Sequence, residues 1–261
     1  MTAEVQKARR GRALPIPWER IPWWLVILAI VGITVGWSVL TSEAYTKVIK
    51  FVAAGLKLTL QVTLISFGIS LIVGLIFGLM RVSKNPVLYA VSTLYVEVMR
   101  GVPLLVIILY MGYVITPVIR DATGGRVDLQ GIPAAVSGIA ICYGAYLAEV
   151  YRSGIQSIER GQMEAARSLG MSYIQAMRHV ILPQAIRRIL PPLGNDFISM
   201  LKDSSLIAVI ALPDLLQMGR LYVSRTFRAF EGYNTVALLY LVLTLFLSLM
   251  VRIVERRTAI E

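Results

Sequence analysis

Long apolar runs limit what this chain can fold into more than any other feature of its sequence. Two of them, Trp23 to Leu40 and Leu58 to Met80, contain no charged residue, and a helix needs about 20 apolar residues to cross a bilayer. Charged residues make up only 16% of the chain, against about 25% in soluble domains. Such a chain has too little polar surface to cover a water-soluble globule, so we predict an integral membrane protein.

Six runs are long enough to span a bilayer, and together they predict an all-helical (all-α) fold. The other four extend over Pro86 to Ile119, Leu129 to Ala148, Leu193 to Pro213 and Gly232 to Val251. A straight helix over the first of these would be about 50 Å long at 1.5 Å per residue, too long for the bilayer, so we predict a break at Pro103. The spacing of Gly74 and Gly78 predicts close packing against a neighbouring helix.

Lysine and arginine residues gather beside these runs and indicate the orientation of the chain. The net charge is +11, and cationic residues that flank membrane spans are retained on the cytoplasmic side, where they meet anionic lipid. With the N-terminus inside, the inner segments hold 16 Lys and Arg residues and the outer segments hold seven. We therefore predict that both termini are cytoplasmic, and we expect no nucleic-acid partner.

The sequence offers no pattern for catalysis or metal binding. Cys142 is the only cysteine, so an internal disulfide and the cysteine spacings of zinc or iron–sulfur sites are excluded. The sequence has no Ser/His/Asp constellation and no GxxxxGK(S/T) phosphate loop. We therefore expect this chain to be neither an enzyme nor the holder of a metal or cofactor.

A polar segment between the fourth and fifth runs carries the most informative pattern, EAARSLG followed by MSYIQAMRHVILP. Gly170 is suited to the left-handed conformation that ends a helix. Ser172 and Gln175 form a capping-box pattern that begins the next helix, and Pro183 stops that helix or starts the following one. We predict two short helices with small and apolar side chains for docking: Met163, Ala165, Ala166, Leu169, Met171, Ile174 and Met177. The residues alone equally allow a hairpin packed on the chain's own membrane face.

The same segment resembles the cytoplasmic loop of ABC-importer permeases, in which EAA, three residues, Gly, nine residues and I-x-L-P follow one another. Here Glu164-Ala165-Ala166, Gly170 and Val180-Ile181-Leu182-Pro183 stand at those places, with Val180 for the usual Ile. Other stretches resemble the polar amino-acid branch (histidine, glutamine, arginine and glutamate-type permeases): LKLTLQVTLIS from Leu56, VEVMRGVPLLV from Val96, YGAYLAEVYRSGI from Tyr143 and LPQAIRRILPPLGNDFISMLKDSSL from Leu182. Two features depart from that branch: Ile107 stands where a glutamine is expected, and an extra N-terminal run precedes the usual five.

The resemblance covers about residues 51–257 and implies a five-helix type I ABC-importer permease core plus one extra N-terminal transmembrane helix. Residues 1–50 would form a basic cytoplasmic N-terminus and this extra helix. Residues 51–257 would form the permease domain, with its coupling loop at about 153–192, and residues 258–261 a short cytoplasmic tail. The residues implied to couple the loop to an ATPase are Glu164, Ala165, Ala166, Gly170, Met171 and Pro183.

The resemblance also implies an assembly in the bacterial plasma (inner) membrane. A cytoplasmic ABC ATPase, in two copies, would bind ATP and Mg, whereas this chain would hold no cofactor. A second copy of the permease, or a homologous permease, would complete the membrane part. An extracytoplasmic amino-acid-binding protein would deliver the substrate.

Ionisable residues inside the predicted spans are candidate substrate contacts, because a charge at bilayer depth normally faces protein or a water-filled path. Arg100 is the expected partner of a substrate α-carboxylate, which a guanidinium binds in a two-pronged geometry. Glu97, Glu149 or Asp203 could receive the substrate's ammonium or a cationic side chain. Tyr143 and Tyr146 could line the same path. Glu97 and Arg100 lie three residues apart on one helical face, as do Glu149 and Arg152, so structural salt bridges are the alternative.

The predicted function is import of polar or charged L-amino acids by alternating access that a partner ATPase drives. Two other classes stay open: an ion-coupled secondary transporter, and a membrane scaffold whose hairpin recruits a cytoplasmic protein. The loop pattern at Glu164 and the lack of a detectable inverted repeat weigh against the first, and the intramembrane Arg100 and Glu97 against the second. Both signs of charge in the spans leave acidic, basic and neutral polar substrates open.

Overall fold

The structure is a computed structural model that describes residues 23–258, and over that range it is built from helices without strands. The chain divides into two compact units, one up to Thr46 and one from Lys47 onward. In the first unit, α1 (Trp23–Thr41) is a helix of 19 residues. It stays a prediction that α1 crosses the membrane as an extra span. The predicted domain boundary at residues 50/51 also stays a prediction. The predicted basic N-terminus up to residue 22 and tail residues 259–261 lie outside the described residues.

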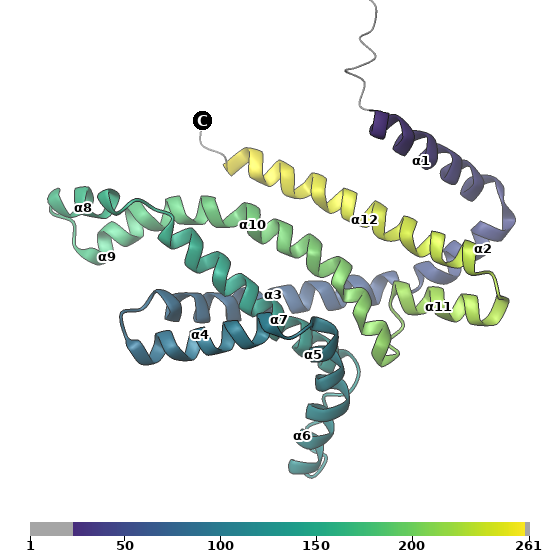
Figure 1. Ribbon diagram of the computed structural model, residues 1–261, viewed down its shortest axis with the longest axis horizontal. Helices are drawn as coiled ribbons and strands as arrows, with labels where there is room; N and C mark the ends of the chain where they lie inside the picture. Colours follow the sequence, from purple (N-terminus) through teal and green to yellow (C-terminus); the bar gives the residue numbers. More distant parts are fainter. Residues whose placement is uncertain (1–22, 259–261) are drawn as a thin grey trace, which may run out of the picture. The chain divides into compact units, whose positions relative to one another are not determined.

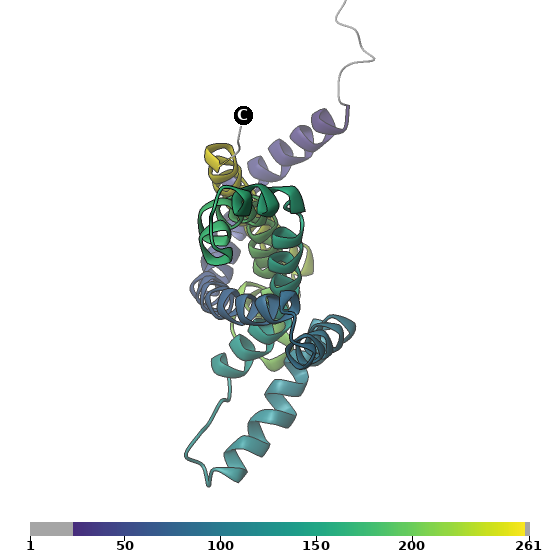
Figure 2. The same ribbon diagram turned by 90° about the vertical axis from the view of Figure 1, so that its left-hand side faces the viewer.

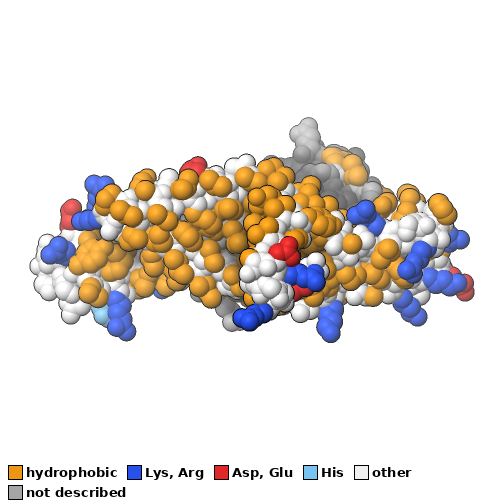
Figure 3. Space-filling model, turned by 90° about the horizontal axis from the view of Figure 1, so that it is seen from below, with side chains coloured by type: hydrophobic (Ala, Val, Ile, Leu, Met, Phe, Trp, Pro, Cys, Tyr) orange, Lys and Arg blue, Asp and Glu red, His pale blue; other side chains and the backbone are white. Residues whose placement is uncertain are grey.

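Between residues 23 and 258, four helical stretches are long and apolar enough to cross a bilayer, and a bent pair of stretches makes a fifth candidate. The four are Glu43–Val82, Leu104–Ala122, Ile132–Gln156 and Ala229–Val254. The bent pair consists of Tyr173–Ile210 and Leu215–Thr226, which meet at 47°. Four to five spans agree with the predicted five-helix core. In Figure 3, apolar side chains cover much of the face shown, whereas charged side chains lie toward its two ends and in a third group near the centre.

The centre of the second unit is the contact between α3 (Leu56–Val82) and α7 (Ile132–Gln156), which lie side by side in Figures 1 and 2. A Cβ atom added to Gly74 would lie 2.6 Å from the Cβ of Leu147, and one added to Gly78 would lie 2.8 Å from the Cβ of Tyr151. Any larger residue would force the helices apart, since real Cβ atoms do not approach so closely. The predicted close packing at Gly74 and Gly78 is therefore confirmed.

The predicted break at Pro103 is also confirmed. Helix α4 (Pro86–Gly101) ends two residues before Pro103, and α5 (Leu104–Tyr110) begins directly after it. From α5 the chain continues through a π-helical turn, Met111–Ile115, into α6 (Thr116–Ala122). Figures 1 and 2 show α6 projecting away from the other helices of this unit.

The polar segment after α7 folds into a helical hairpin that leads into the longest bent stretch. The hairpin consists of α8 (Arg160–Ser168) and α9 (Tyr173–Ala176), and a π-helical turn, Met177–Ile181, joins it to α10 (Leu182–Asp203). Pro183 lies in the first turn of α10, as predicted for a proline that begins a helix. The fifth predicted run, Leu193 to Pro213, begins inside α10, which continues through Pro191 and Pro192.

The end of α10 turns sharply toward the last two helices. A 3₁₀ turn, Ser204–Ile210, follows α10, and Asp214 caps α11 (Leu215–Thr226) by accepting hydrogen bonds from the backbone N–H groups of Leu216 and Gln217. Helix α12 (Ala229–Thr258) then returns along α10 and α11. Helix α10 thus packs against both α7 and α12.

Candidate functional site

A polar pocket lies between α7 and α10, where two short residue spacings bring polar groups together. Asp196, Ser199 and Asp203 follow one another at three and four residues along α10, which places them on one helical face. Tyr143 and Tyr146 are three residues apart on α7. With Leu104 and Cys142 these residues line a cavity of about 260 Å³. That volume lies just below the range of about 300–1,000 Å³ typical of small-molecule sites.

One hydrogen bond fixes the orientation of the Asp203 carboxylate in the pocket. The hydroxyl of Tyr143 donates to Oδ2 of Asp203 at 2.8 Å, and Tyr143 is itself buried. The rings of Tyr143 and Tyr146 are tilted against each other with centroids 5.8 Å apart. The phenol and the carboxylate thus hold each other in place, and the second carboxylate oxygen stays available to a ligand.

Arg100 stands beside this pocket rather than in an ion pair. It lies in the last turn of α4, and its guanidinium carbon is 5.4 Å from the centroid of the Tyr146 ring. Within residues 23–258, no carboxylate forms a salt bridge with Arg100. Its position over a ring that lines the pocket leaves its hydrogen-bond donors unpaired with acidic side chains, as expected of a group that receives a carboxylate.

The other two predicted carboxylates lie in a separate ion network. Arg81 donates from Nη1 to Oε2 of Glu149 at 2.9 Å and from Nη2 to Oε1 of Glu97 at 3.2 Å. Arg152 donates to the same Glu149 carboxylate from Nε at 3.0 Å and also from Nη2. The side chain of Arg81 is only 12% exposed. We refer to Arg81, Glu97, Glu149 and Arg152 as the ion network.

The ion network joins the ends of α3, α4 and α7, and neither of its glutamates lines the polar pocket. This geometry favours the alternative that Glu97 and Glu149 form structural salt bridges. Glu97 and Arg100 share a helix face but are not paired with each other among the described residues. The structure therefore brings together Arg100, Tyr143, Tyr146 and Asp203, and it leaves Glu97 and Glu149 apart from them.

The helical hairpin has the local geometry that its sequence predicts. Gly170 has φ of 86°, in the left-handed region, which glycine adopts without a Cβ clash. The hydroxyl of Ser172 accepts from the backbone N–H of Gln175, whose side chain accepts from the N–H of Ser172. Both the predicted helix end and the capping box are confirmed.

The docking face of the hairpin is narrower than predicted. Glu164 and Ala165 are exposed, and Leu169 and Ile174 are 82% and 75% exposed. In contrast, Ala166 is buried. Met163 and Met177 pack on a cluster at the base of the hairpin: Ile158, Ile181, Ala185 and Ile189. Ala166 is thus covered by the chain itself and Met163 and Met177 are covered in part, whereas the role of this segment in coupling to an ATPase stays a prediction.

The family model described as "Binding-protein-dependent transport system inner membrane component" matches residues 70–260. The chain belongs to this permease family. "Probable glutamine ABC transporter permease protein GlnM" of Bacillus subtilis is 42% identical over 201 residues, which make up 76% of this chain and 89% of that protein. "Glutamine transport system permease protein GlnP" of Escherichia coli is 37% identical over 218 residues, 84% of this chain and 97% of that protein.

A solved structure supports the assignment of this chain to the permease family. It is described as "Crystal structure of an amino acid ABC transporter with histidines", has 41% sequence identity and a TM-score of 0.73, and the match covers 84% of this chain and 97% of that one. The predicted family and the all-helical permease fold are confirmed. The family implies a multi-pass subunit of the bacterial inner membrane, an ATPase partner that hydrolyses ATP, and a binding protein.

Two groups of the permease's polar pocket escaped the sequence reasoning. Asp196 and Ser199 lie two turns and one turn before Asp203 on α10, and this spacing is visible in the sequence once Asp203 is a candidate. Arg81 was predicted only as a cytoplasmic flanking cation, because nothing local connects it with Glu149, 68 residues further along the chain.

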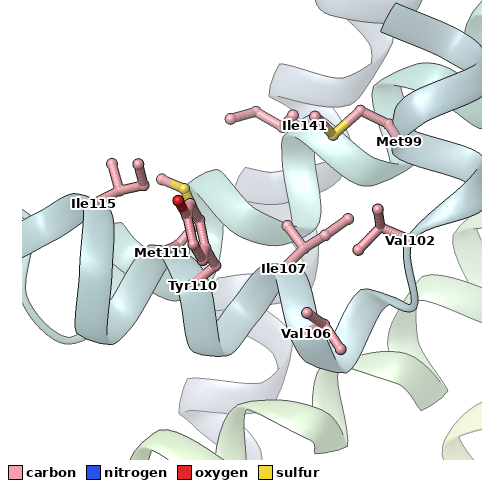
Figure 4. A pocket seen from close by; sticks show the side chains of 8 residues that line it. All are labelled: Met99, Val102, Val106, Ile107, Tyr110, Met111, Ile115 and Ile141. Atoms are coloured by element: carbon pink, nitrogen blue, oxygen red, sulfur yellow. The ribbon is translucent and has the colours of Figure 1, made fainter.

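Ile107, which departs from the residue predicted by the resemblance, lines a second, apolar pocket. Figure 4 shows this pocket beside α5; its volume is about 380 Å³, and it is lined by Met99, Val102, Val106, Ile107, Tyr110, Met111, Ile115 and Ile141. Ile107, at the position where the resemblance predicts a glutamine, is buried among apolar side chains. The pocket has no charged lining residue, so it does not offer the chemistry that binds an amino acid's two charged groups.

Proposed function

We propose that this permease carries polar or charged L-amino acids into the cytoplasm and that its polar pocket binds them in transit. The observation on which this rests is the grouping of a guanidinium, two carboxylates and two phenols between α4, α7 and α10. In this proposal Arg100 receives the α-carboxylate and Asp203 the α-ammonium, while Tyr143 and Tyr146 line the path. The names of the related glutamine permeases support the amino-acid class.

The proposal assigns ATP coupling to the helical hairpin. Its exposed Glu164, Ala165 and Leu169 would seat on the ATPase partner, and Gly170 and Met171 would set the turn between the two helices. Two ATPase copies would bind ATP and Mg, and two permeases, identical or homologous, would form the path. The binding protein would deliver the amino acid from outside, with both termini of this chain in the cytoplasm. Pro183 would anchor the start of α10, which connects the hairpin with the pocket.

Uptake by reconstituted proteoliposomes tests the proposal. The complete complex, with its ATPase and binding protein, should take up labelled L-amino acids only when ATP is present. The Arg100→Ala variant should lose uptake while the complex still assembles, because Arg100 lies beside Tyr146 at the end of α4 and outside the hairpin that would seat on the ATPase. The Glu164→Lys variant should instead lose coupling between ATP hydrolysis and uptake, with substrate binding retained.

The same assay separates the two other classes. Uptake that survives ATP depletion but collapses with an uncoupler would identify an ion-coupled secondary transporter. A complex that assembles and transports nothing would identify a scaffold. Normal uptake by Arg100→Ala would retire the assignment of the pocket.

A further inference from the structure

Another cavity lies at the end of the membrane domain that carries the helical hairpin, where the turn from α3 to α4 also lies (Figure 1). Its volume is about 640 Å³, larger than that of the polar pocket. Two separate parts of the chain contribute to its lining: Val82 and Lys84 from the end of α3 and the following turn, and Arg160, Met163 and Tyr173 from the hairpin. We refer to it as the hairpin cavity.

The hairpin cavity lies where two candidate membrane spans end. The last residues of the spans Glu43–Val82 and Ile132–Gln156 are both among its lining residues. Ile158 and Ile181, which are buried, and the partly buried Met163 give it an apolar side. This apolar side continues the apolar surface of the spans, so the cavity lies at the depth where the hydrocarbon of the bilayer gives way to lipid headgroups.

The exposed part of the lining carries two cations and one carboxylate, Lys84, Arg160 and Glu159. Within residues 23–258, every salt bridge belongs to the ion network, so none of these three side chains forms one. This holds even for Glu159 and Arg160, which are neighbours in the chain. Three charges beside an apolar surface are thus available to a ligand that carries an anion, a cation and an apolar part.

We propose that the hairpin cavity binds a phospholipid whose headgroup carries a primary ammonium, as in phosphatidylethanolamine. Lys84 and Arg160 bind the phosphate oxygens, and Glu159 accepts hydrogen bonds from the ammonium. The apolar side of the cavity covers the part of the lipid next to the headgroup. A headgroup without a cation leaves Glu159 beside the phosphate with no partner. The site is separate from the polar pocket, and lipid binding there does not depend on the proposed function.

Phosphatidylethanolamine and phosphatidylcholine with the same dioleoyl chains form a matched pair of probes. They differ only in the methyl groups on the headgroup nitrogen, which replace its hydrogen-bond donors. Native mass spectrometry of the purified full-length permease counts the lipids bound in detergent, where the packing of headgroups in a bilayer has no influence. The wild-type protein should bind phosphatidylethanolamine about three- to fivefold more tightly, as an exposed charge pair allows.

Variants assign the two parts of the headgroup. Glu159→Gln should bring the ratio of the two affinities close to one by weakening phosphatidylethanolamine alone, and Glu159→Asp should keep the preference. The double variant Lys84→Gln/Arg160→Gln should weaken both lipids equally, because both carry the phosphate. Arg167→Gln removes an exposed cation from the same short helix, α8, outside the cavity, and it should behave as wild type.

Each contrary result has its own meaning. Equal binding of the two probes by the wild-type protein, or tighter binding of dioleoyl phosphatidylglycerol, would overturn the primary-ammonium class. Displacement of the lipid by an equal concentration of phosphoethanolamine, which has no chains, would make the ligand a soluble compound. Loss of the preference on addition of the ATPase subunit would make the cavity part of the ATPase seat. If Glu159→Gln is not recovered, the wild-type ratio and the double variant decide the question. The effect of Arg100→Ala on uptake tests the proposed function separately from all of these.

Discussion

Two clusters of charge in the membrane domain start from the same sequence spacing and end differently. Glu149 and Arg152, three residues apart on α7, bond to each other, and Arg81 adds a second cation to the same carboxylate. Glu97 and Arg100 have the same spacing on α4 but separate, because Glu97 turns to Arg81 while Arg100 lies over an aromatic ring of α7. The ion network is thus closed within the chain, and the polar pocket is open.

The difference shows what decides whether an intramembrane charge serves structure or ligand binding. A charge whose partners come from neighbouring helices is compensated before any ligand arrives, and it holds those helices together. A charge that faces a cavity without such partners, like Asp196, carries a desolvation cost that a ligand relieves. We therefore expect changes in the ion network to alter stability first, and changes in the pocket to alter binding first.

Replacement of the shared cation should have the largest effect on stability. Arg81→Ala removes both bridges that join α3 to α4 and α7, while Glu149 keeps Arg152 as a partner and Glu97 is exposed to solvent. We expect a loss of about 1–3 kcal/mol, between the ranges for exposed and for fully buried pairs. Thermal unfolding of the purified complex measures it, with Arg120→Ala at the exposed end of α6 as control. An unchanged midpoint would show that the ion network does not hold the helices together.

Arg100→Ala should produce the reverse pattern. Loss of charge-assisted hydrogen bonds to a carboxylate should weaken amino-acid binding by about 1.5–3 kcal/mol. Stability should fall by less than about 1 kcal/mol, since only the contact with the Tyr146 ring is lost. Calorimetric titration and thermal unfolding of the same sample compare the two quantities. A larger loss of stability than of binding energy would erase the distinction between the two clusters.

The Tyr143→Phe variant tests how far the pocket is preorganised. It removes the hydroxyl that donates to Asp203, and a single hydrogen bond contributes about 1 kcal/mol. We expect amino-acid binding to weaken severalfold, because Asp203 is no longer held in place. Tyr113→Phe, at an exposed tyrosine of the π-helical turn, is the matched control. Equal effects of both variants would exclude a positioning role for the Tyr143 hydroxyl.

The smallest effect is expected from Glu97→Gln. The Glu97 side chain is 67% exposed, and exposed ion pairs contribute roughly 0–1 kcal/mol. Binding of the amino acid should be unchanged, since Glu97 does not line the pocket. A binding measurement that shows a tenfold loss with Glu97→Gln would return this residue to the list of substrate contacts.

Features that depend on composition or on local spacing were predictable from the sequence. The apolar runs identify the membrane, Pro103 identifies a break, and Gly170 identifies a left-handed helix end. The contact glycines of α3 belong to this group, because a pair of small residues four apart is useful only where another helix approaches. Each of these features is contained in a few neighbouring residues.

Features that depend on the rotation of one helix against another were not predictable. Whether Glu97 meets Arg100, Arg81 or a substrate is decided by the packing of α3, α4 and α7, which brings together residues far apart in the chain. The same holds for Ala166, whose place in the sequence fits an exposed docking face and a buried position equally well. Asp196 was within reach of the sequence, since it shares a helical face with Asp203.

The two adjacent prolines inside α10 have a mechanical consequence. Pro191 and Pro192 lack the N–H groups that would bond to the carbonyls of Arg187 and Arg188, so two successive rungs of the helix are missing between the hairpin and Asp196. A helix that lacks two backbone hydrogen bonds bends most easily at that place. A displacement of the hairpin would therefore change the angle of the part of α10 that carries Asp196 and Asp203. We expect Pro191→Ala/Pro192→Ala to stiffen this joint, so that spin labels placed on both sides of it report a narrower spread of distances.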